Sequence, residues 1–223
     1  MSLEESAPSP TETRERLLEA AGEIFAERGF RAATTREICK RAGANVAAIN
    51  YHFRDKERLY EEVLQFAHGQ APEPLPQLRE GGGPEERLLA FVEWFLFRCL
   101  GEGRPAWHLK LLLREMAEPS PALAPLVESE LRPIFEALEM ICREVLAEGA
   151  SPRAVSLCAR SILGQCIYYR VAQPILARLV PEQRYGPEDI RALARHVSSF
   201  SLGGLQEVGL QARTSAPSGE EHP

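Results

Sequence analysis

The side chains best suited to reading a base sequence follow one another between residues 45 and 56. Asn50, Tyr51 and His52 supply an amide, a phenol and an imidazole in succession, shortly after two alanines. The major groove of duplex DNA is about 12 Å wide, so a helix that enters it must expose side chains that are small or that form hydrogen bonds. An amide is suited to pairing with adenine. These residue types favour contact with the bases of double-stranded DNA.

Basic residues are concentrated around the same segment. Eight lysines and arginines but three acidic residues lie between positions 28 and 58, a net charge of +5, whereas the whole chain of 223 residues carries −6. A basic island supplies phosphate contacts, and an acidic remainder repels the duplex and enforces one docking orientation. A solvated charged surface without a nucleic-acid partner would give the same count, so the charge alone leaves both interpretations open.

The sequence does not indicate a catalytic or metal centre. It contains no HExxH, GxSxG or P-loop motif and no cluster of paired carboxylates, and its five histidines are scattered. The five cysteines are widely spaced without a CxxC pair, which is typical of small core residues in a reducing compartment. We therefore expect no catalytic residue, no metal and no cofactor. A small all-helical enzyme is the alternative from another functional class.

Helical periodicity before the basic island predicts the element that supports it. After a start over residues 1–10 that is expected to be disordered, apolar residues recur at helical spacing from Leu17 to Phe25. This pattern predicts a first helix over about residues 11–28. Gly29 is expected to provide its left-handed C-cap.

Two short helices are predicted to follow. Thr34, with Glu37 three residues later, forms a capping box that starts a helix, and Gly43 ends it. Asn45 can then cap a third helix. One face of this third helix is apolar and is expected to be buried: Val46, Ile49 and Phe53. Two short helices joined by a glycine-containing turn and supported by a longer helix form a helix-turn-helix.

A second domain is predicted beyond the Pro- and Gly-rich segment over residues 71–84. Apolar runs of ten to fifteen residues there indicate buried helices of a bundle. Two long final helices, over about residues 152–179 and 187–210, contain small residues that allow close helix approach. The predicted fold is all-α with about nine helices. It has a three-helix helix-turn-helix domain with a linking fourth helix (11–71), a larger C-terminal helical bundle for ligand binding and dimerisation (84–211), and a disordered tail (212–223).

The helix-turn-helix residues resemble a known family. Thr35 and Arg36, the Ala-Gly turn at 42–43 and the run I-N-Y-H-F-x-x-K over 49–56 are similar to the DNA-binding domain of TetR/AcrR-family repressors. The resemblance implies DNA contact from the second and third helices, and a lysine–phosphate contact at the start of the fourth. The residues implied are Thr35, Arg36, Asn45, Val46, Ala47, Ala48, Asn50, Tyr51, His52 and Lys56. Because the family commonly has an aromatic residue where this chain has Asn50, the operator sequence does not follow from the resemblance.

Further strings resemble the CecR (YbiH)-like subgroup of that family. They are ANVAAINYHF, over 44–53, and LLLREMAEPSPAL and SILGQCIYYR, over 111–123 and 161–170. The resemblance implies that the terminal helices pair as a four-helix bundle in a homodimer. Two-fold symmetry would set two recognition helices one DNA turn apart, matching an inverted-repeat operator.

A repressor of this type needs a pocket for a small-molecule effector, and such pockets are apolar with a few convergent polar groups. The candidates in the C-terminal part are Phe95, Trp107, His108, Arg114, Cys166 and Tyr169. Each has a purely structural alternative, as a core residue, an ion-pair partner or part of the dimer seam. A bundle that docks a protein partner and binds no effector is the alternative function.

The sequence also bears on location. It contains no run of eighteen apolar residues, and its N-terminus is acidic where a signal peptide is basic and then apolar. We therefore expect a cytoplasmic protein with no membrane partner.

Overall fold

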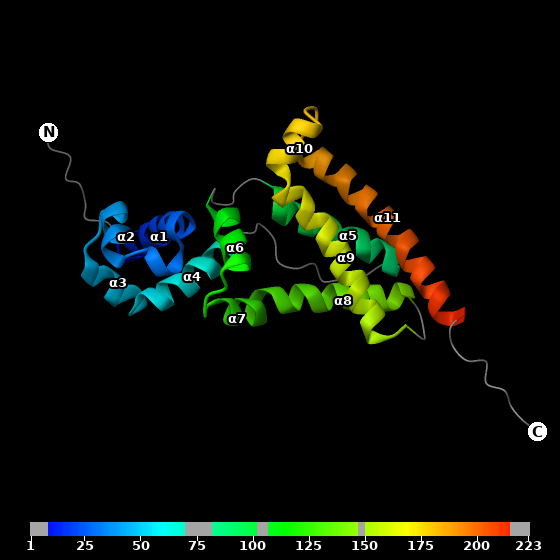
Figure 1. The fold of residues 1–223 in the computed structure, drawn as a ribbon, viewed down its shortest axis with the longest axis horizontal. Coiled ribbons are helices and arrows are strands. Elements are labelled where there is room, and N and C mark those ends of the chain that lie inside the picture. The colour runs from blue at the N-terminus through cyan, green and yellow to red at the C-terminus, as the bar shows by residue number, and fades with distance from the viewer. Residues whose placement is uncertain (1–8, 70–81, 102–106, 147–149, 215–223) are drawn as a thin grey trace, which may run out of the picture. The chain divides into compact units, whose positions relative to one another are not determined.

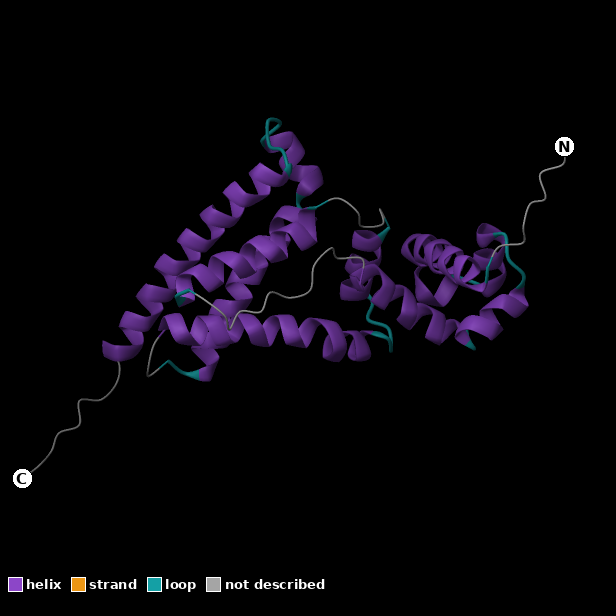
Figure 2. Ribbon diagram, turned by 180° about the vertical axis from the view of Figure 1, so that it is seen from behind, coloured by secondary structure: helices purple, strands orange, loops and turns teal. Residues whose placement is uncertain are grey.

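The computed structural model describes residues 9–69, 82–101, 107–146 and 150–214, and every regular element in these ranges is helical (Figures 1 and 2). The all-α prediction is confirmed. In chain order the elements are α1 (Pro10–Ala32), α2 (Thr35–Ala42), α3 (Val46–Phe53), α4 (Lys56–Gly69), α5 (Pro84–Leu100), α6 (His108–Ala117), α7 (Leu123–Leu126), the π-helical turn η1 (Val127–Leu131), α8 (Arg132–Leu146), α9 (Pro152–Val171), α10 (Gln173–Leu179) and α11 (Pro187–Thr214).

The chain divides into two compact units that interrupt each other in sequence. Unit 1 comprises residues 1–71 and 103–131, and unit 2 comprises residues 72–102 and 132–223. The sequence-based boundary differs from this division, because it assigned residues 84–211 to one C-terminal domain. Unit 1 therefore includes α6, α7 and η1 in addition to the four N-terminal helices.

In unit 1, α1 is the central support and packs against α2, α3, α4 and α6. Its backbone leaves the helical region at Gly29, where φ is 78° and ψ is 164°, and one further turn then reaches Ala32. The predicted end at residue 28 thus marks a break inside the helix. A positive φ favours glycine because it lacks a Cβ atom, so Gly29 permits the sharp change of direction.

The three caps predicted for the helix-turn-helix are confirmed. Thr34 and Glu37 form the reciprocal capping box of α2, and Gly43 ends that helix with a left-handed backbone, φ 62°. The side chain of Asn45 accepts a hydrogen bond from the backbone N–H of Ala48 at 3.1 Å and so starts α3. An N-cap of this kind stabilises a helix by about 1 kcal/mol.

The core of unit 1 explains how α3 is held. Ile49 and Phe53 are buried in one cluster with side chains of α1, α2 and α4, among them Phe25, Ile38 and Tyr60. Full burial of such a side chain stabilises the fold by about 1.5–3 kcal/mol. The prediction that Val46 shares this buried face is wrong, because its side chain is 45% exposed.

Unit 2 is a helical bundle in which α5, α8, α9 and α11 pack against one another around a separate apolar core. The predicted helix over 152–179 is two helices, because the backbone departs from helical geometry at Ala172 and Pro174 lies in the first turn of α10. Proline lacks the N–H that a continuous helix needs. Within the described residues, no helix is both long enough and apolar enough to cross a membrane.

Candidate nucleic-acid interface

The outer face of α3 is polar and accessible. Tyr51 is 79% exposed, and Ala47 and Asn50 are also exposed, whereas Ile49 and Phe53 on the opposite face are buried. Ala48 and His52 are half-buried at the edge of this face. The aromatic ring of Tyr51 meets the imidazole of His52 edge to face, with 4.9 Å between ring centroids. The helix therefore presents small and hydrogen-bonding side chains together, as major-groove contact requires.

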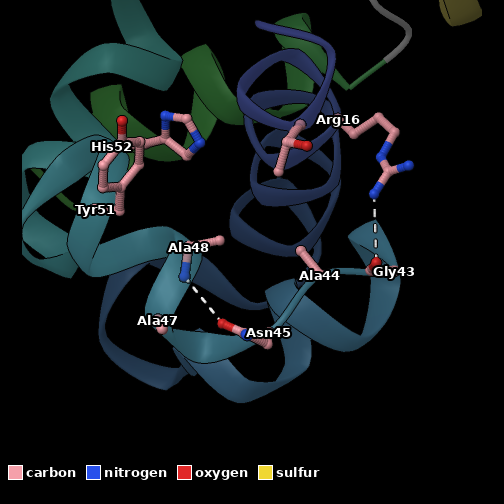
Figure 3. A pocket seen from close by; sticks show the side chains of 9 residues that line it. Arg16, Gly43, Ala44, Asn45, Ala47, Ala48, Tyr51 and His52 are labelled. Carbon is pink, nitrogen blue, oxygen red and sulfur yellow. Dashed lines mark hydrogen bonds between the residues drawn. The ribbon is translucent and has the colours of Figure 1, made fainter. Parts of the chain in front are cut away.

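A shallow hollow of about 420 Å³ lies beside α3 (Figure 3). It is lined by Thr13, Arg16, Gly43, Ala44, Asn45, Ala47, Ala48, Tyr51 and His52. Five of these residues are among the predicted DNA contacts. Thr13 and Arg16 were not predicted, because they lie on α1, thirty residues earlier in the sequence. The Arg16 guanidinium donates to the carbonyl oxygen of Gly43 at 3.3 Å, which places a positive charge at the turn before α3.

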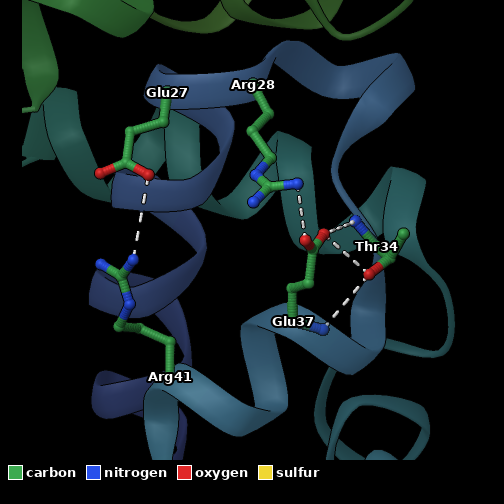
Figure 4. A network of polar contacts seen from close by, with 5 residues as sticks. All are labelled: Glu27, Arg28, Thr34, Glu37 and Arg41. Carbon is green, nitrogen blue, oxygen red and sulfur yellow. Dashed lines mark hydrogen bonds and ion pairs between the residues drawn. The ribbon is translucent and has the colours of Figure 1, made fainter.

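The start of α2 is fixed by a polar network (Figure 4). Glu37 accepts hydrogen bonds from the backbone and hydroxyl of Thr34 and forms an ion pair with Arg28 at 2.7 Å. These interactions lower the pKa of Glu37, the hydrogen bond from the Thr34 hydroxyl contributing most. Thr35, the next residue, is half-buried, and Arg36 is exposed. The network therefore fixes the start of α2, and with it the positions of the two predicted contact residues on this helix.

The basic island is partly neutralised within the protein. Arg28 is paired with Glu37, Arg41 with Glu23 and Glu27, and Arg58 with Glu61. The exposed basic side chains of the island that have no ion pair among the described residues are Arg31, Arg36, Lys40 and Arg54. Exposed ion pairs contribute about 0–1 kcal/mol each. The charge available for phosphate contact is consequently smaller than the sequence count of +5.

Lys56 has an environment that its sequence motif did not indicate. Its ammonium donates to the carbonyl oxygens of Phe30 at 3.0 Å and Ala33 at 3.2 Å, and lies 4.7 Å from the centre of the Phe30 ring. Asp55 accepts from the backbone N–H of Arg58 at 2.8 Å, which places a carboxylate at the start of α4. The ammonium thus links α4 to the end of α1. A phosphate contact from this side chain would require it to leave these partners.

The six effector candidates do not fall in one unit. Trp107, His108 and Arg114 belong to unit 1, where all but Arg114 are buried, and the other three belong to unit 2. The indole N–H of Trp107 donates to Glu19 at 2.9 Å. Its ring lies against Gly22 so closely that a Cβ atom there would come within 2.3 Å of it. These contacts make Trp107 part of the packing of α6 on α1, a position that differs from the predicted C-terminal pocket.

A buried carboxylate joins α6 to α4. Glu115 is 1% exposed and accepts from the Tyr60 hydroxyl at 2.6 Å and from the backbone and hydroxyl of Ser120 at 3.2 and 3.1 Å. Burial first, and then the Glu115 carboxylate, raises the pKa of Tyr60, so that this hydroxyl stays a proton donor. No sequence pattern indicates this pair, because Tyr60 and Glu115 lie 55 positions apart.

The remaining candidates surround part of the core of unit 2. Phe95 on α5 stacks parallel to Phe91 with 6.1 Å between ring centroids. Cys166 on α9 is fully buried, and burial raises the pKa of its thiol to about 12. Tyr169 packs against the same core, as does Tyr185, whose hydroxyl is buried without a hydrogen-bond partner in the described part of the chain.

Among the described residues, no group of three or more His, Cys, Asp or Glu side chains is placed to hold a metal ion.

Two family models match the chain. One, described as the C-terminal domain of the HTH-type transcriptional dual regulator CecR, matches residues 84–205, which is more than half of the chain. The other, described as bacterial regulatory proteins of the tetR family, matches residues 17–63. The second match includes α2 and α3 whole.

Two individual proteins that are similar to this chain are also described as HTH-type transcriptional regulators. The HTH-type transcriptional regulator UidR of Escherichia coli strain K12 is 27% identical over 184 residues, covering 81% of this chain and 90% of UidR. The HTH-type transcriptional repressor KstR2 of Mycolicibacterium smegmatis is 41% identical over 56 residues. That match spans about a quarter of either protein, 25% of this chain and 27% of KstR2.

A solved structure shares the fold. The crystal structure of AibR in complex with isovaleryl coenzyme A and operator DNA superposes with a TM-score of 0.61 at 18% identity. The match covers 84% of this chain and 97% of AibR.

Proposed function

This chain belongs to the TetR family of bacterial transcriptional regulators, and we propose that it is a homodimeric repressor that binds an inverted-repeat operator and is released by a small-molecule effector. The observation that carries this proposal is the exposed polar face of α3, centred on Asn50 and Tyr51, above a buried apolar face. The buried face thereby holds α3 on the interior of unit 1, and the outward side chains of α3 are accessible to DNA. A regulator of chromosomal DNA acts in the bacterial cytoplasm.

Contact with the DNA bases is assigned to α3, and contact with the phosphates is assigned to residues on the neighbouring helices. Asn50 and Tyr51 are the proposed base-contacting side chains, because both are exposed and able to form hydrogen bonds. Arg36 and Arg16 flank them on α2 and α1 and are suited to phosphate contact. Lys56 is assigned the smaller contribution to phosphate contact, because its ammonium already donates to two carbonyl oxygens.

Dimerisation is supported by apolar side chains that unit 2 leaves uncovered. On α9 the residues Leu157, Ser161, Gly164, Tyr168 and Val171 recur at helical spacing and are all exposed. Tyr168 is 52% exposed, and a Cβ atom on Gly164 would meet nothing within 4 Å. An exposed apolar surface flanking small residues is typical of an interface between proteins.

The final helix has a matching face. Phe200, Gly203, Gly204 and Leu210 share one side of α11, and Phe200 is 67% exposed. Cβ atoms on either glycine would meet open space. Because α9 and α11 also pack against each other, a second copy that covers both would form a four-helix interface. A two-fold dimer places two recognition helices symmetrically, which is why an inverted repeat is proposed.

The effector site is proposed within unit 2, near Phe95, Cys166 and Tyr169. The Tyr185 hydroxyl, which is buried and has no hydrogen-bond partner among the described residues, supports this position, since an unsatisfied buried hydroxyl costs about 1–3 kcal/mol and a ligand acceptor would remove that cost. The combination of aromatic rings and hydroxyls suits an apolar molecule with one hydrogen-bonding group. A ligand shifts the DNA equilibrium only through its differential affinity for the two states, about 1–3 kcal/mol in typical regulators.

Sedimentation velocity of the full chain, with and without a Phe200→Glu substitution, tests the proposal. We expect a dimer at micromolar concentration for the natural chain and a monomer for the variant, because a carboxylate would be buried at the interface without a partner. Leu179→Glu is the control, since Leu179 is as exposed as Phe200 but lies on α10 outside the proposed interface. A natural chain that sediments as a monomer would contradict the homodimer.

A further inference from the structure

A cavity of about 670 Å³ in unit 1 has basic and aromatic walls and is separate from the proposed DNA-reading face of α3. It lies between the end of α1, over residues 28–32, the side chain of Tyr60 on α4, and residues 114–121 of α6 and the following turn. All of these residues belong to unit 1. We propose that this cavity binds an organic anion, a carboxylate or phosphate ester carried by an apolar body.

Three guanidinium groups line the cavity: Arg28, Arg31 and Arg114. Arg31 is exposed, and its side chain has no ion pair or hydrogen bond within the described part of the chain. Arg114 donates one weak hydrogen bond, 3.4 Å long, to the carbonyl oxygen of Glu27. A guanidinium carries five N–H donors in a planar fork, so both retain donors for an anion. Bidentate pairing of arginine with carboxylate or phosphate is among the stronger hydrogen-bonded contacts in proteins.

Two acidic residues also line the cavity, and their contacts decide whether the cavity favours a cationic or an anionic ligand. Both carboxylate oxygens of the buried Glu115 already accept hydrogen bonds, one from Tyr60 and the other from Ser120. Glu118 is exposed. Because Arg28 is already paired with Glu37, a cation would find one available carboxylate against the two guanidinium groups of Arg31 and Arg114. The lining favours an anion.

Much of the remaining lining is apolar, so the ligand is expected to carry an apolar body beside its anionic group. Phe30, Tyr60, Pro119 and Pro121 contribute ring surfaces. Ligand sites for small organic molecules are commonly about 300–1,000 Å³ in volume, so this cavity holds more than an inorganic ion.

This site concerns the free protein and does not depend on the proposed operator, dimer or effector site of unit 2.

Isothermal titration calorimetry of the full chain without DNA tests the inference with three probes that share one alkyl chain. Octyl phosphate and octanoate carry the two anionic groups, and 1-octanol is the uncharged control. We expect at least one anionic probe to bind and 1-octanol to bind at least tenfold more weakly. Comparison of the two anions shows whether the phosphate or the carboxylate is the better ligand.

The decisive variant is Arg31→Ala, since no described residue is a hydrogen-bond or ion-pair partner of the Arg31 side chain, so its loss should not disturb the fold. We expect it to weaken binding of the anionic probe about tenfold, as the loss of a charged hydrogen bond should. Arg54→Ala is the matched control, because it removes the same charge from an exposed position of unit 1 that lies outside the cavity and has no ion pair among the described residues. Glu118→Gln should strengthen binding, since it removes the opposing charge.

Three results would overturn the inference. One is the absence of binding by either anionic probe, and another is equal binding of 1-octanol, which would indicate an apolar site. The third is an equal loss of affinity in Arg31→Ala and Arg54→Ala, which would indicate general attraction to a basic surface.

Discussion

Replacement of Lys56 by methionine distinguishes two roles for this side chain. The substitution keeps an unbranched apolar stem and removes the ammonium, which donates to the carbonyl oxygens of Phe30 and Ala33 and lies over the Phe30 ring. A hydrogen bond to a charged group contributes about 1.5–3 kcal/mol, and an exposed cation–π contact about 0.5–1 kcal/mol. Because Lys56 is only half-buried, we expect a net loss of about 2 kcal/mol.

Two assays on the same variant separate the roles. For a chain of this length, a loss of about 2 kcal/mol corresponds to a midpoint of thermal unfolding about 4–8 °C lower. If the ammonium links α4 to α1, this drop appears and the dependence of DNA affinity on salt is unchanged. If it binds phosphate, the logarithmic salt slope falls by about one unit per half-site. Lys40→Met, which removes an exposed lysine without an ion pair in the described residues, is the stability control.

A variant as stable as the natural chain, with a salt slope lower by about one unit per half-site, would contradict a role of the ammonium in linking α4 to α1. Lys56 would then be a phosphate ligand, as its sequence motif implies, and its contacts with Phe30 and Ala33 would contribute nothing measurable.

The remaining predictions concern α3 and the contacts that hold α6. Tyr51→Ala should cost about 1–3 kcal/mol per half-site on the specific operator and less on random DNA; fluorescence anisotropy with both duplexes measures this, and equal losses would exclude base reading. Tyr60→Phe should destabilise the protein by about 1–3 kcal/mol, because it leaves one oxygen of the buried Glu115 without its donor; an unchanged urea midpoint would contradict that role. Gly22→Ala should cost about 1–3 kcal/mol through overlap with the Trp107 ring, and the Trp107→Leu background should remove most of that penalty; a penalty of the same size in both backgrounds would place its cause elsewhere.

The helix-turn-helix could be predicted from the sequence because its determinants are local. The capping box at Thr34 and Glu37, the Asn45 cap and the left-handed Gly43 each act within four residues of their own position. Such signals depend on side chains that satisfy nearby backbone groups, so they survive without knowledge of the tertiary structure. The exposed polar face of α3 follows from the same local geometry.

The placement of α6 could not be predicted for the opposite reason. Its position in unit 1 depends on contacts between residues about 55 to 90 positions apart, such as Tyr60 with Glu115 and Trp107 with Glu19. Neither pair has a signature in the sequence. Apolar runs such as the one that includes α6 indicate burial but not the partner, and proximity in sequence to α5 suggested the bundle. Val46 was assigned to the core on spacing alone, although it is the first residue of α3 and its side chain remains 45% exposed.

Selection of bound fragments from random duplex DNA by the purified full chain tests the central claim most directly. The account predicts enrichment of one inverted repeat whose half-site centres lie about one helical turn apart, as two symmetric recognition helices require. The Asn50→Ala and Tyr51→Ala variants should lose that enrichment and still bind DNA weakly. Enrichment of a motif without two-fold symmetry, or the same motif selected by the natural chain and both variants, would contradict the claim that a dimer reads its operator through α3.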